Sequence, residues 1–222
     1  MAAGRDCDVF EHGPGLVLRR ARDGRSLDAE VAVMRWVAAH DYPVPLVHEA
    51  AGPEMVMERL DGPRMLDDVV RHPWRLVRHA RTLATLHGRL ATLPAADWMR
   101  QSHFPGDGIV HLDLHPLNVL ITDRGPVVID WTNAGQGDPA ADIASTWMIS
   151  VTTRPGKDEL PALVRAFVTV GRHVFLQVFL RGVDREAGRR WLAAMGEYRK
   201  RDRNTRPEER ERIDRLVARE GR

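Results

Sequence analysis

Apolar and polar positions alternate in short runs through the first sixty residues, and glycine or proline ends most runs. The runs "DVFEHG" (8–13) and "GLVLRRARDG" (15–24) flank a Gly-Pro-Gly turn, which is typical of a β-hairpin. "EMVMERLDG" (54–62) predicts a further strand, and Pro43 and Pro45 favour an extended path before it. This part of the chain is therefore predicted to be rich in strands.

Between these strands the spacing of apolar residues changes to that of a helix. Val31, Met34 and Val37 recur three positions apart, which predicts a helix over 26–40. Ser26 is the candidate N-terminal cap of this helix, and Glu30 lies in its first turns.

Beyond Gly62 the helical period dominates. "WRLVRHARTLATLHGRL" (74–90) places His87 on nearly the same stripe as its leucines, which predicts a buried amphipathic helix with His87 in the core. "DPAADIASTWMIS" (138–150) predicts another helix, and two or three more follow it. The segment 203–222 has few apolar side chains, so we expect its end to be loosely packed.

Two apolar runs around the turn "TDRG" interrupt these helices within "IVHLDLHPLNVLITDRGPVVIDW" (109–131). They are predicted to pair as a hairpin, which brings the two ends of the segment together. The elements as a whole predict an α+β fold, with a strand-rich region over 1–60 and a mainly helical region over 61–222.

Composition narrows the class of protein. Cys7 is the single cysteine, so no disulfide can form within the chain. The first residues show no apolar signal sequence, and Arg172 and His173 interrupt the apolar stretch "FVTVGRHVFLQVFL" (167–180). A cytoplasmic protein without a membrane span is expected.

Charge is distributed unevenly along the chain. Residues 1–153 hold 15 Lys and Arg against 20 Asp and Glu, whereas residues 154–222 hold 18 against 11. Acidic and basic residues interleave in this basic tail, as on a solvated helix face, and no RNA-binding signature or zinc spacing accompanies them. Nucleic acid is therefore not expected as a partner.

Polar residues gather within the predicted hairpin segment, and three interpretations compete. His111, Asp113 and His115 alternate, as they would on the polar face of a strand. The two histidines would also suit a metal-dependent hydrolase, although a further ligand from His87, His103 or His173 would be needed. The third interpretation uses Asp113, Asn118 and Asp130: one carboxylate faces a hydroxyl group, while the amide and the second carboxylate offer oxygen ligands to Mg²⁺. That arrangement suits phosphoryl transfer.

"HLDLHPLNVLI", "VVIDW" and "GDPAADIA" together resemble the three central motifs of the aminoglycoside phosphotransferase-like kinases, distant relatives of the protein kinases. The resemblance covers about residues 8–150. It implies a two-lobed protein-kinase-like fold, with a small β-rich N-lobe over 1–60, here shortened, and a mainly helical C-lobe over 61–222. The implied reaction is transfer of the γ-phosphoryl group of ATP, with GTP possible, to a small-molecule hydroxyl group.

The resemblance also implies roles for residues of the C-lobe. Asp113 would be the catalytic base or orient the nucleophile, and Asn118 and Asp130 would bind Mg²⁺. His111 would brace the catalytic loop, and His115 would bond loop backbone or approach the phosphates. The remaining two acidic positions, Asp138 and Asp142, would accept backbone N–H groups of that loop and so support the site.

For the N-lobe, the resemblance implies a cation that pairs with Glu30 and contacts the nucleotide phosphates. The family usually has lysine at this position, whereas this chain offers Arg19, with Arg20 as the alternate. "EHGPG" (11–15) is expected to be a compressed nucleotide-covering loop. The hinge would bind the purine through backbone groups of three residues, with a methionine near the ring: Glu58, Arg59, Leu60 and Met57.

The acceptor is expected to be neutral or anionic, because the basic tail is poorly suited to binding a polycationic aminoglycoside. Aromatic residues of the C-terminal helices would either line an apolar pocket or belong to the core: Trp147, Phe175, Phe179, Trp191 and Tyr198. A rival hypothesis retains the fold but makes the protein a catalytically silent nucleotide-binding regulator.

Overall fold

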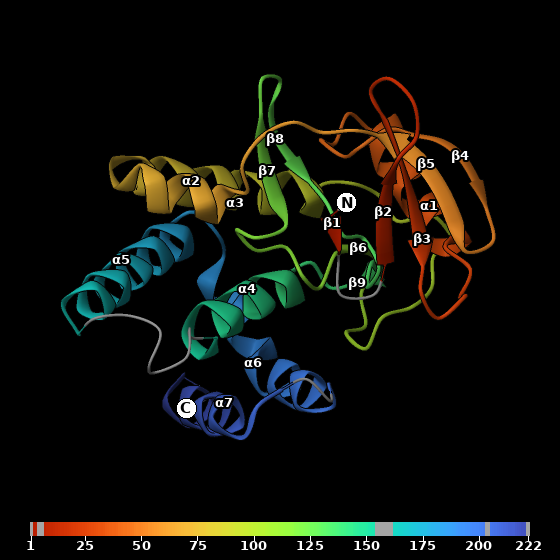
Figure 1. Cartoon of the computed structure of the whole chain (residues 1–222). Helices are drawn as coiled ribbons and strands as arrows, with labels where there is room; N and C mark the ends of the chain where they lie inside the picture. Colours follow the sequence, from red (N-terminus) through yellow and green to blue (C-terminus); the bar gives the residue numbers. More distant parts are fainter. Residues whose placement is uncertain (1, 4–6, 154–161, 203–204, 221–222) are drawn as a thin grey trace.

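The computed structural model of the chain describes residues 2–3, 7–153, 162–202 and 205–220. Its N-terminal part is an antiparallel sheet of strand order β1-β2-β3-β5-β4, at the right of Figure 1. The strands are β1 (Ala2–Ala3), β2 (Cys7–Glu11), β3 (Leu16–Ala21), β4 (Val47–Ala51) and β5 (Glu54–Glu58). The predicted hairpin is confirmed as β2 and β3, which pair from Cys7 opposite Ala21 to Glu11 opposite Val17.

Helix α1 (Asp28–Ala39) connects β3 to β4 and buries Val31, Val33, Met34 and Val37. Ser26 is not its N-terminal cap, because the cap position is Leu27 and no side chain caps the helix. Ser26 lies one residue before the cap position, and its hydroxyl accepts the Asp28 N–H at 3.0 Å. Glu30 lies in the first turn and is buried.

The chain leaves the sheet through a close contact at Gly62. Its φ of +150° lies in a region that favours glycine. A Cβ atom built at this position would lie 2.2 Å from the carbonyl oxygen of Ile121. The Ile121 N–H donates to the Pro63 carbonyl at 2.9 Å, so the segment after β5 is held against the segment around Ile121. Glycine at 62 thus permits the approach that links the two parts of the molecule.

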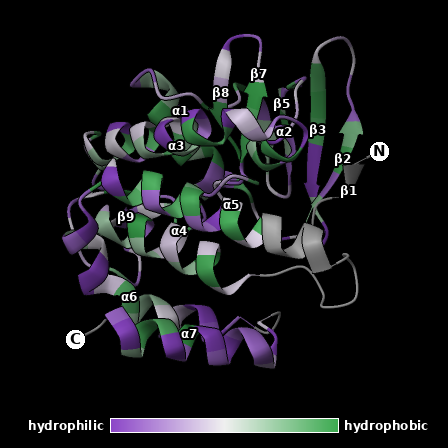
Figure 2. Ribbon diagram, turned by 90° about the vertical axis from the view of Figure 1, so that its left-hand side faces the viewer, coloured by the Kyte–Doolittle hydropathy of each residue, from purple (hydrophilic) through white to green (hydrophobic). Residues whose placement is uncertain are grey.

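Helices dominate the rest of the chain (Figure 2). They are α2 (Met65–Arg71), the 3-10 turn η1 (Pro73–Arg75), α3 (Leu76–Ala91), α4 (Ala140–Thr152), α5 (Ala162–Arg181), α6 (Arg185–Lys200) and α7 (Pro207–Glu220). α3 packs against α5, and α4 packs against α6 and α7. His87 lies on the buried face of α3, as predicted.

Two small strand pairs carry the chain between these helices. β7 (Val119–Thr122) and β8 (Gly125–Val128) form the predicted hairpin, with Thr122 opposite Gly125 at its turn. β6 (Gly108–Val110) pairs with β9 (Gly135–Gly137), a contact that sequence patterns did not predict. β6 and β9 bring the segment before Asp113 close to the segment after Asp130, and the β7–β8 hairpin brings the residues after Asn118 close to those before Asp130.

The small antiparallel sheet and the mainly helical remainder confirm the two-lobed α+β fold. The expectation of a loosely packed C-terminal end is wrong for α7, because Ile213 and Leu216 are buried against the rest of the helical part. Two well-placed apolar side chains suffice to attach this otherwise charged helix. None of the described helices has the length and apolar character needed to cross a membrane.

Candidate active site

The loop between β6 and β7 (111–118), predicted to be the catalytic loop, is held by one buried carboxylate. Asp142, in the first turn of α4, accepts the N–H of His111 at 2.8 Å and the N–H of Leu112 at 2.5 Å. Burial raises the pKa of Asp142 to about 7, although both backbone N–H groups favour the ionised form. Leu112 has a φ of +62°, an uncommon conformation for a residue with a side chain. Asp142 thus holds the loop in the position predicted for a supporting carboxylate.

His111 connects this loop to the strand that precedes Asp130. The imidazole is fully buried, packs against Trp131, and donates from Nε2 to the Ile129 carbonyl at 3.1 Å. Nδ1 accepts the Asp113 N–H at 3.2 Å. Burial lowers the pKa of His111, in keeping with a neutral ring that donates at one nitrogen and accepts at the other. This placement matches the bracing role implied for His111.

Asp113 lies at the centre of a small polar cluster. The Asn118 amide donates to its carboxylate and to its backbone carbonyl, both at 2.9 Å, and His115 Nε2 lies 3.3 Å from its other carboxylate oxygen. His115 Nδ1 accepts the Leu117 N–H at 3.2 Å. Burial acts to raise the pKa of Asp113, but the hydrogen bond from His115 and nearby positive charges lower it to about 2. The carboxylate is therefore ionised at neutral pH.

The second carboxylate of the site, Asp130, is more exposed and adopts a φ of +65°. Its Oδ1 accepts the Thr132 hydroxyl at 3.0 Å and lies 3.7 Å from an Arg19 nitrogen. Arg19 also pairs with buried Glu30 and donates to the Thr132 hydroxyl at 3.1 Å. These contacts join β3, α1 and the hairpin end. Sequence reasoning missed Thr132, whose position two residues after a predicted metal ligand was its only signal.

Of the two adjacent arginines, Arg19 occupies the place implied for the cation. Arg19 is nearly buried beside Glu30, whereas Arg20 forms an exposed ion pair with Glu54 at 2.6 Å. Burial acts to lower the pKa of Arg19, but the Glu30 carboxylate outweighs this effect and the pKa is raised. Arg19 is therefore firmly charged.

The hinge differs in part from the expectation. The N–H of Glu58 donates to Leu46 and the N–H of Arg59 donates to Gly15, both at 2.8 Å, so neither is available to a purine. Leu60 N–H makes no hydrogen bond within the described residues, and Met57 lies in β5, opposite Val17. Of the three hinge N–H groups, only that of Leu60 is without a partner in the described part of the chain.

The "EHGPG" segment is also reassigned. It forms the turn between β2 and β3, and its last glycine binds the hinge at Arg59. The expectation that it covers the nucleotide phosphates is wrong. The connection between β1 and β2 falls on residues 4–6, outside the described residues.

Asp138 likewise has a different role from the one expected. Its carboxylate accepts the Ala140 N–H at 2.9 Å and the Trp191 indole N–H at 2.7 Å, and no hydrogen bond to the catalytic loop is among its described contacts. Asp138 thus orients the start of α4 and ties α6 to it. The sequence offered no signal for this pairing, because Trp191 lies 53 residues away.

The basic tail contributes positive charge near Asp113. Arg199 helps to lower the Asp113 pKa, and Arg100 acts on neighbouring Tyr198, whose pKa is raised mainly by burial. Tyr198 contacts the His103 ring at 5.2 Å. The aromatic set divides accordingly: Trp147, Phe175 and Phe179 belong to the core, whereas Trp191 and Tyr198 are partly buried around Phe104.

The oxygen atoms of the site suit a hard cation. The Asn118 amide nitrogen is turned toward Asp113, which leaves its carbonyl oxygen available, and Asp130 Oδ2 makes no hydrogen bond in the described part of the chain. Oxygen ligands of this kind are those that Mg²⁺ prefers. Among the described residues, no group of three or more His, Cys, Asp or Glu side chains is arranged to hold a metal.

Comparisons with known proteins agree with this geometry. A model of the phosphotransferase enzyme family matches residues 2–107 and 102–176. A thiamine kinase from Salmonella newport (strain SL254) is 41% identical over 39 residues, which make up 18% of this chain and 14% of that protein. The match therefore spans only a small part of the length of these curated relatives.

Solved structures resemble nearly the whole chain. A choline/ethanolamine kinase family protein from Mesorhizobium loti shares 17% identity with a TM-score of 0.59, over 99% of this chain and 85% of the other. Aminoglycoside phosphotransferase APH(4)-Ia, in a ternary complex with AMP-PNP and hygromycin B, shares 14% identity with a TM-score of 0.62, over 98% of this chain and 94% of the other. At these identities the likeness shows the fold.

Proposed function

Because the chain belongs to the phosphotransferase enzyme family, we propose that it transfers the γ-phosphoryl group of ATP to a hydroxyl group of a small molecule. The observation that carries the proposal is that two polar clusters lie at the open end of the β7–β8 hairpin, where the Ile129 N–H donates to the Asn118 carbonyl at 3.0 Å. Asp113 and Asn118 hold one side, and Asp130 with Arg19 holds the other. Such an arrangement is able to position a hydroxyl group opposite a nucleotide phosphate.

Asp113 would accept the hydrogen bond of the acceptor hydroxyl. The acceptor oxygen attacks the γ-phosphorus, the bond to the β-phosphate oxygen breaks, and ADP leaves. Because the Asp113 pKa is about 2, this carboxylate is a weak base. It would orient the hydroxyl first and take its proton late, once the forming P–O bond has made the hydroxyl acidic.

Asn118 and Asp130 would hold Mg²⁺ through their available oxygens. When bound, the ion would neutralise negative charge on the phosphates as the terminal group moves. Arg19 would contact a phosphate while Glu30 keeps its guanidinium in place. Thr132 would keep the Asp130 carboxylate directed toward this guanidinium.

The purine would lie against the hinge, with Leu60 N–H as its backbone donor. ATP is favoured because two similar structures were solved with AMP-PNP. GTP remains an alternative nucleotide, since one backbone donor does not discriminate between the two purines.

The acceptor is proposed to be neutral or anionic. The guanidinium of Arg100 is exposed and has no ion-pair partner in the described residues, and Arg199 adds charge near Asp113. A polycationic acceptor would be repelled at this face. The thiamine kinase similarity makes thiamine, a monocationic alcohol, a useful test of this charge argument.

The first experiment is the thermal shift with ATP or GTP, each with and without Mg²⁺. Ligand at one hundred times its dissociation constant stabilises a fold by about 2.7 kcal/mol. For the wild type, we expect the nucleotide-induced thermal shift to be larger with Mg²⁺ than without it. For Asp130→Ala, we expect the shift to be the same with and without Mg²⁺. Asp123→Ala, which removes a carboxylate from the β7–β8 turn, is the matched control and should behave like the wild type.

Absence of any nucleotide shift in the wild type would contradict the proposal. A magnesium-dependent shift without ADP release for neutral, anionic or cationic alcohols would instead favour the silent regulator. Phosphorylation restricted to polycationic aminoglycosides would contradict the charge argument while leaving the kinase assignment intact.

A further inference from the structure

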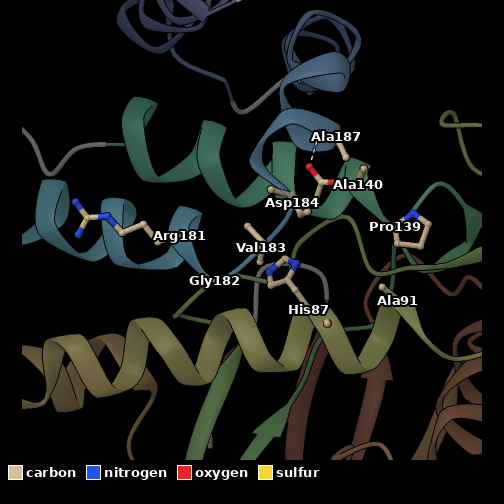
Figure 3. Close-up of a pocket in the computed structure, with 11 residues that line it drawn as sticks. His87, Ala91, Pro139, Ala140, Arg181, Gly182, Val183, Asp184 and Ala187 are labelled. Carbon is tan, nitrogen blue, oxygen red and sulfur yellow. Dashed lines mark hydrogen bonds between the residues drawn. The ribbon is translucent and has the colours of Figure 1, made fainter.

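A pocket opens away from the candidate active site. It lies between α3, the start of α4 and the connection from α5 to α6, and it encloses about 540 Å³ (Figure 3). This volume is typical of small-molecule sites. None of the residues proposed above to contact nucleotide, metal or acceptor lines it.

The pocket wall contains one buried polar ring, that of His87. Its side chain rises from α3 toward Val183 in the α5–α6 connection (Figure 3), and only 5% of the residue is exposed. Nε2 lies 3.2 Å from the Leu114 carbonyl oxygen and 3.1 Å from the Thr146 hydroxyl oxygen. A carbonyl oxygen only accepts hydrogen bonds, so Nε2 carries the hydrogen.

The other ring nitrogen is consequently an acceptor without a partner. Burial lowers the pKa of His87 to about 3, so the ring is neutral at physiological pH and Nδ1 bears a lone pair. No hydrogen bond to Nδ1 exists within the described residues. A buried acceptor in the wall of an open pocket favours a ligand that donates a hydrogen bond.

The surroundings of this acceptor are mostly apolar. Ala140, Ile143 and Val183 contribute aliphatic surface to the wall. Arg181 also lines the pocket, but its guanidinium points away from the other lining side chains (Figure 3). One carboxylate oxygen of Asp184 accepts the Ala187 N–H at 2.9 Å and caps α6. The lining therefore combines apolar surface with the neutral His87 acceptor and the capping carboxylate of Asp184.

We propose that this pocket binds a small uncharged molecule with an apolar body and one hydrogen-bond donor, a hydroxyl or ring N–H group that donates to His87 Nδ1. The ligand would sit directly behind the catalytic loop, because the same imidazole holds the carbonyl of Leu114, the residue between Asp113 and His115. A donor on Nδ1 polarises the ring and strengthens the Nε2 hydrogen bond to that carbonyl.

Phenol is the test probe, and anisole is its matched partner without the donor. Titration of the full chain, labelled with ¹⁵N in its histidine rings, reports both affinity and the nitrogen involved. We expect phenol to shift the Nδ1 resonance of His87 and to bind about 3- to 10-fold more tightly than anisole, the effect of one net hydrogen bond. Equal affinities, an unshifted resonance, or no binding would overturn the proposal.

Two leucine substitutions on α3 locate the binding. A Cβ atom at Gly88 would meet no atom within 4 Å, so Gly88→Leu fills pocket space without disturbing the contacts of His87. Thr85→Leu adds the same side chain to an exposed position that does not line the pocket. We expect Gly88→Leu to weaken phenol binding at least about 10-fold and Thr85→Leu to leave it unchanged. Phenol binding that survives in Gly88→Leu would place it elsewhere and refute the proposal.

Discussion

The two halves of the candidate site are held in different ways. The half around Asp113 is braced by side chains that are almost completely buried, with His111 at 0% and Asp142 at 2% exposure. The half around Asp130 is open: that side chain is 48% exposed, and its contacts reach across the molecule to Arg19 in the N-terminal sheet. The fold therefore presets the catalytic loop, whereas the nucleotide half depends on how the sheet and the hairpin are placed.

Backbone strain is present in both halves. Leu112 and Asp130 have φ values of +62° and +65°, and such conformations cost about 1–3 kcal/mol. Asp142 and Ser145 compensate on the loop side through hydrogen bonds to the Leu112 N–H and carbonyl. At Asp130, itself half-exposed, the compensating contacts are those with the partly buried Thr132 and Arg19 side chains. We expect nucleotide and Mg²⁺ to complete the second half and to leave the first unchanged.

Replacing Asp142 should produce the largest loss of stability. Asp142→Ala leaves the N–H groups of His111 and Leu112 buried without an acceptor, which should lower the free energy of unfolding by about 4 kcal/mol. Urea denaturation measures this loss. Asp142→Asn retains the shape and one acceptor oxygen, so its loss should be about half as large. Equal stability of the alanine variant and the wild type would show that the loop does not depend on this carboxylate.

The two adjacent arginines of β3 offer a paired test of the nucleotide half. Arg19→Ala leaves buried Glu30 without its partner and should lower the free energy of unfolding by about 3 kcal/mol. The variant should also lose most of its affinity for ATP. Arg20→Ala removes only an exposed ion pair and should lower the free energy of unfolding by less than about 1 kcal/mol. Denaturation and calorimetric titration with ATP follow both effects. A larger effect of Arg20→Ala on ATP binding would reverse the assignment.

Acid should weaken the loop half through Asp113. Its pKa is lowered from 3.8 to about 2 in the folded protein, so the ionised carboxylate contributes stability above pH 4, and this contribution is lost as pH falls toward 2. At pH 7 the free energy of unfolding of the wild type should exceed that of Asp113→Asn by about 1–2 kcal/mol, and this difference should depend on pH. Urea denaturation at pH 7, 4 and 3 should show this difference narrowing. A difference that grows with acid would contradict the lowered pKa.

Thr132→Val should have the smallest effect. It removes the hydroxyl group that forms hydrogen bonds with Arg19, Glu30 and Asp130 while it preserves the shape of the side chain. The free energy of unfolding should fall by about 1 kcal/mol. Because Mg²⁺ and nucleotide would also organise Asp130, the loss should shrink when both are present. Thermal unfolding with and without ligands checks this, and a loss that persists unchanged would show that Thr132 has a purely structural role.

Local features of the site were predictable from the sequence. The turn "TDRG" between two apolar runs predicts the β7–β8 hairpin, and the helical spacing around Glu30 predicts α1. These signals depend on neighbours within a few positions, where backbone preferences and side-chain periodicity decide the structure. The order of the three central motifs likewise predicted which family the chain belongs to.

Features that depend on distant segments were not predictable in this way. β1 consists of two alanines without a strand signal, so sequence patterns predict the hairpin of β2 and β3 as the first and do not predict that "EHGPG" lies next to the hinge. Thr132 meets Arg19 across 113 positions, and Asp138 meets Trp191 across 53. Such pairs are decided by how the sheet and helices pack, which single-sequence patterns do not encode.

The most direct test of the central claim is transfer of labelled γ-phosphate from ATP to alcohol acceptors. Wild type and Asp113→Asn are compared by mass spectrometry across neutral, anionic and monocationic alcohols, with Mg²⁺ present. We predict a phosphorylated neutral or anionic product with the wild type, formed about 10²- to 10⁴-fold more slowly by the variant. Equal rates for the two proteins, or ATP binding with no phosphorylated product from any acceptor, would contradict the account.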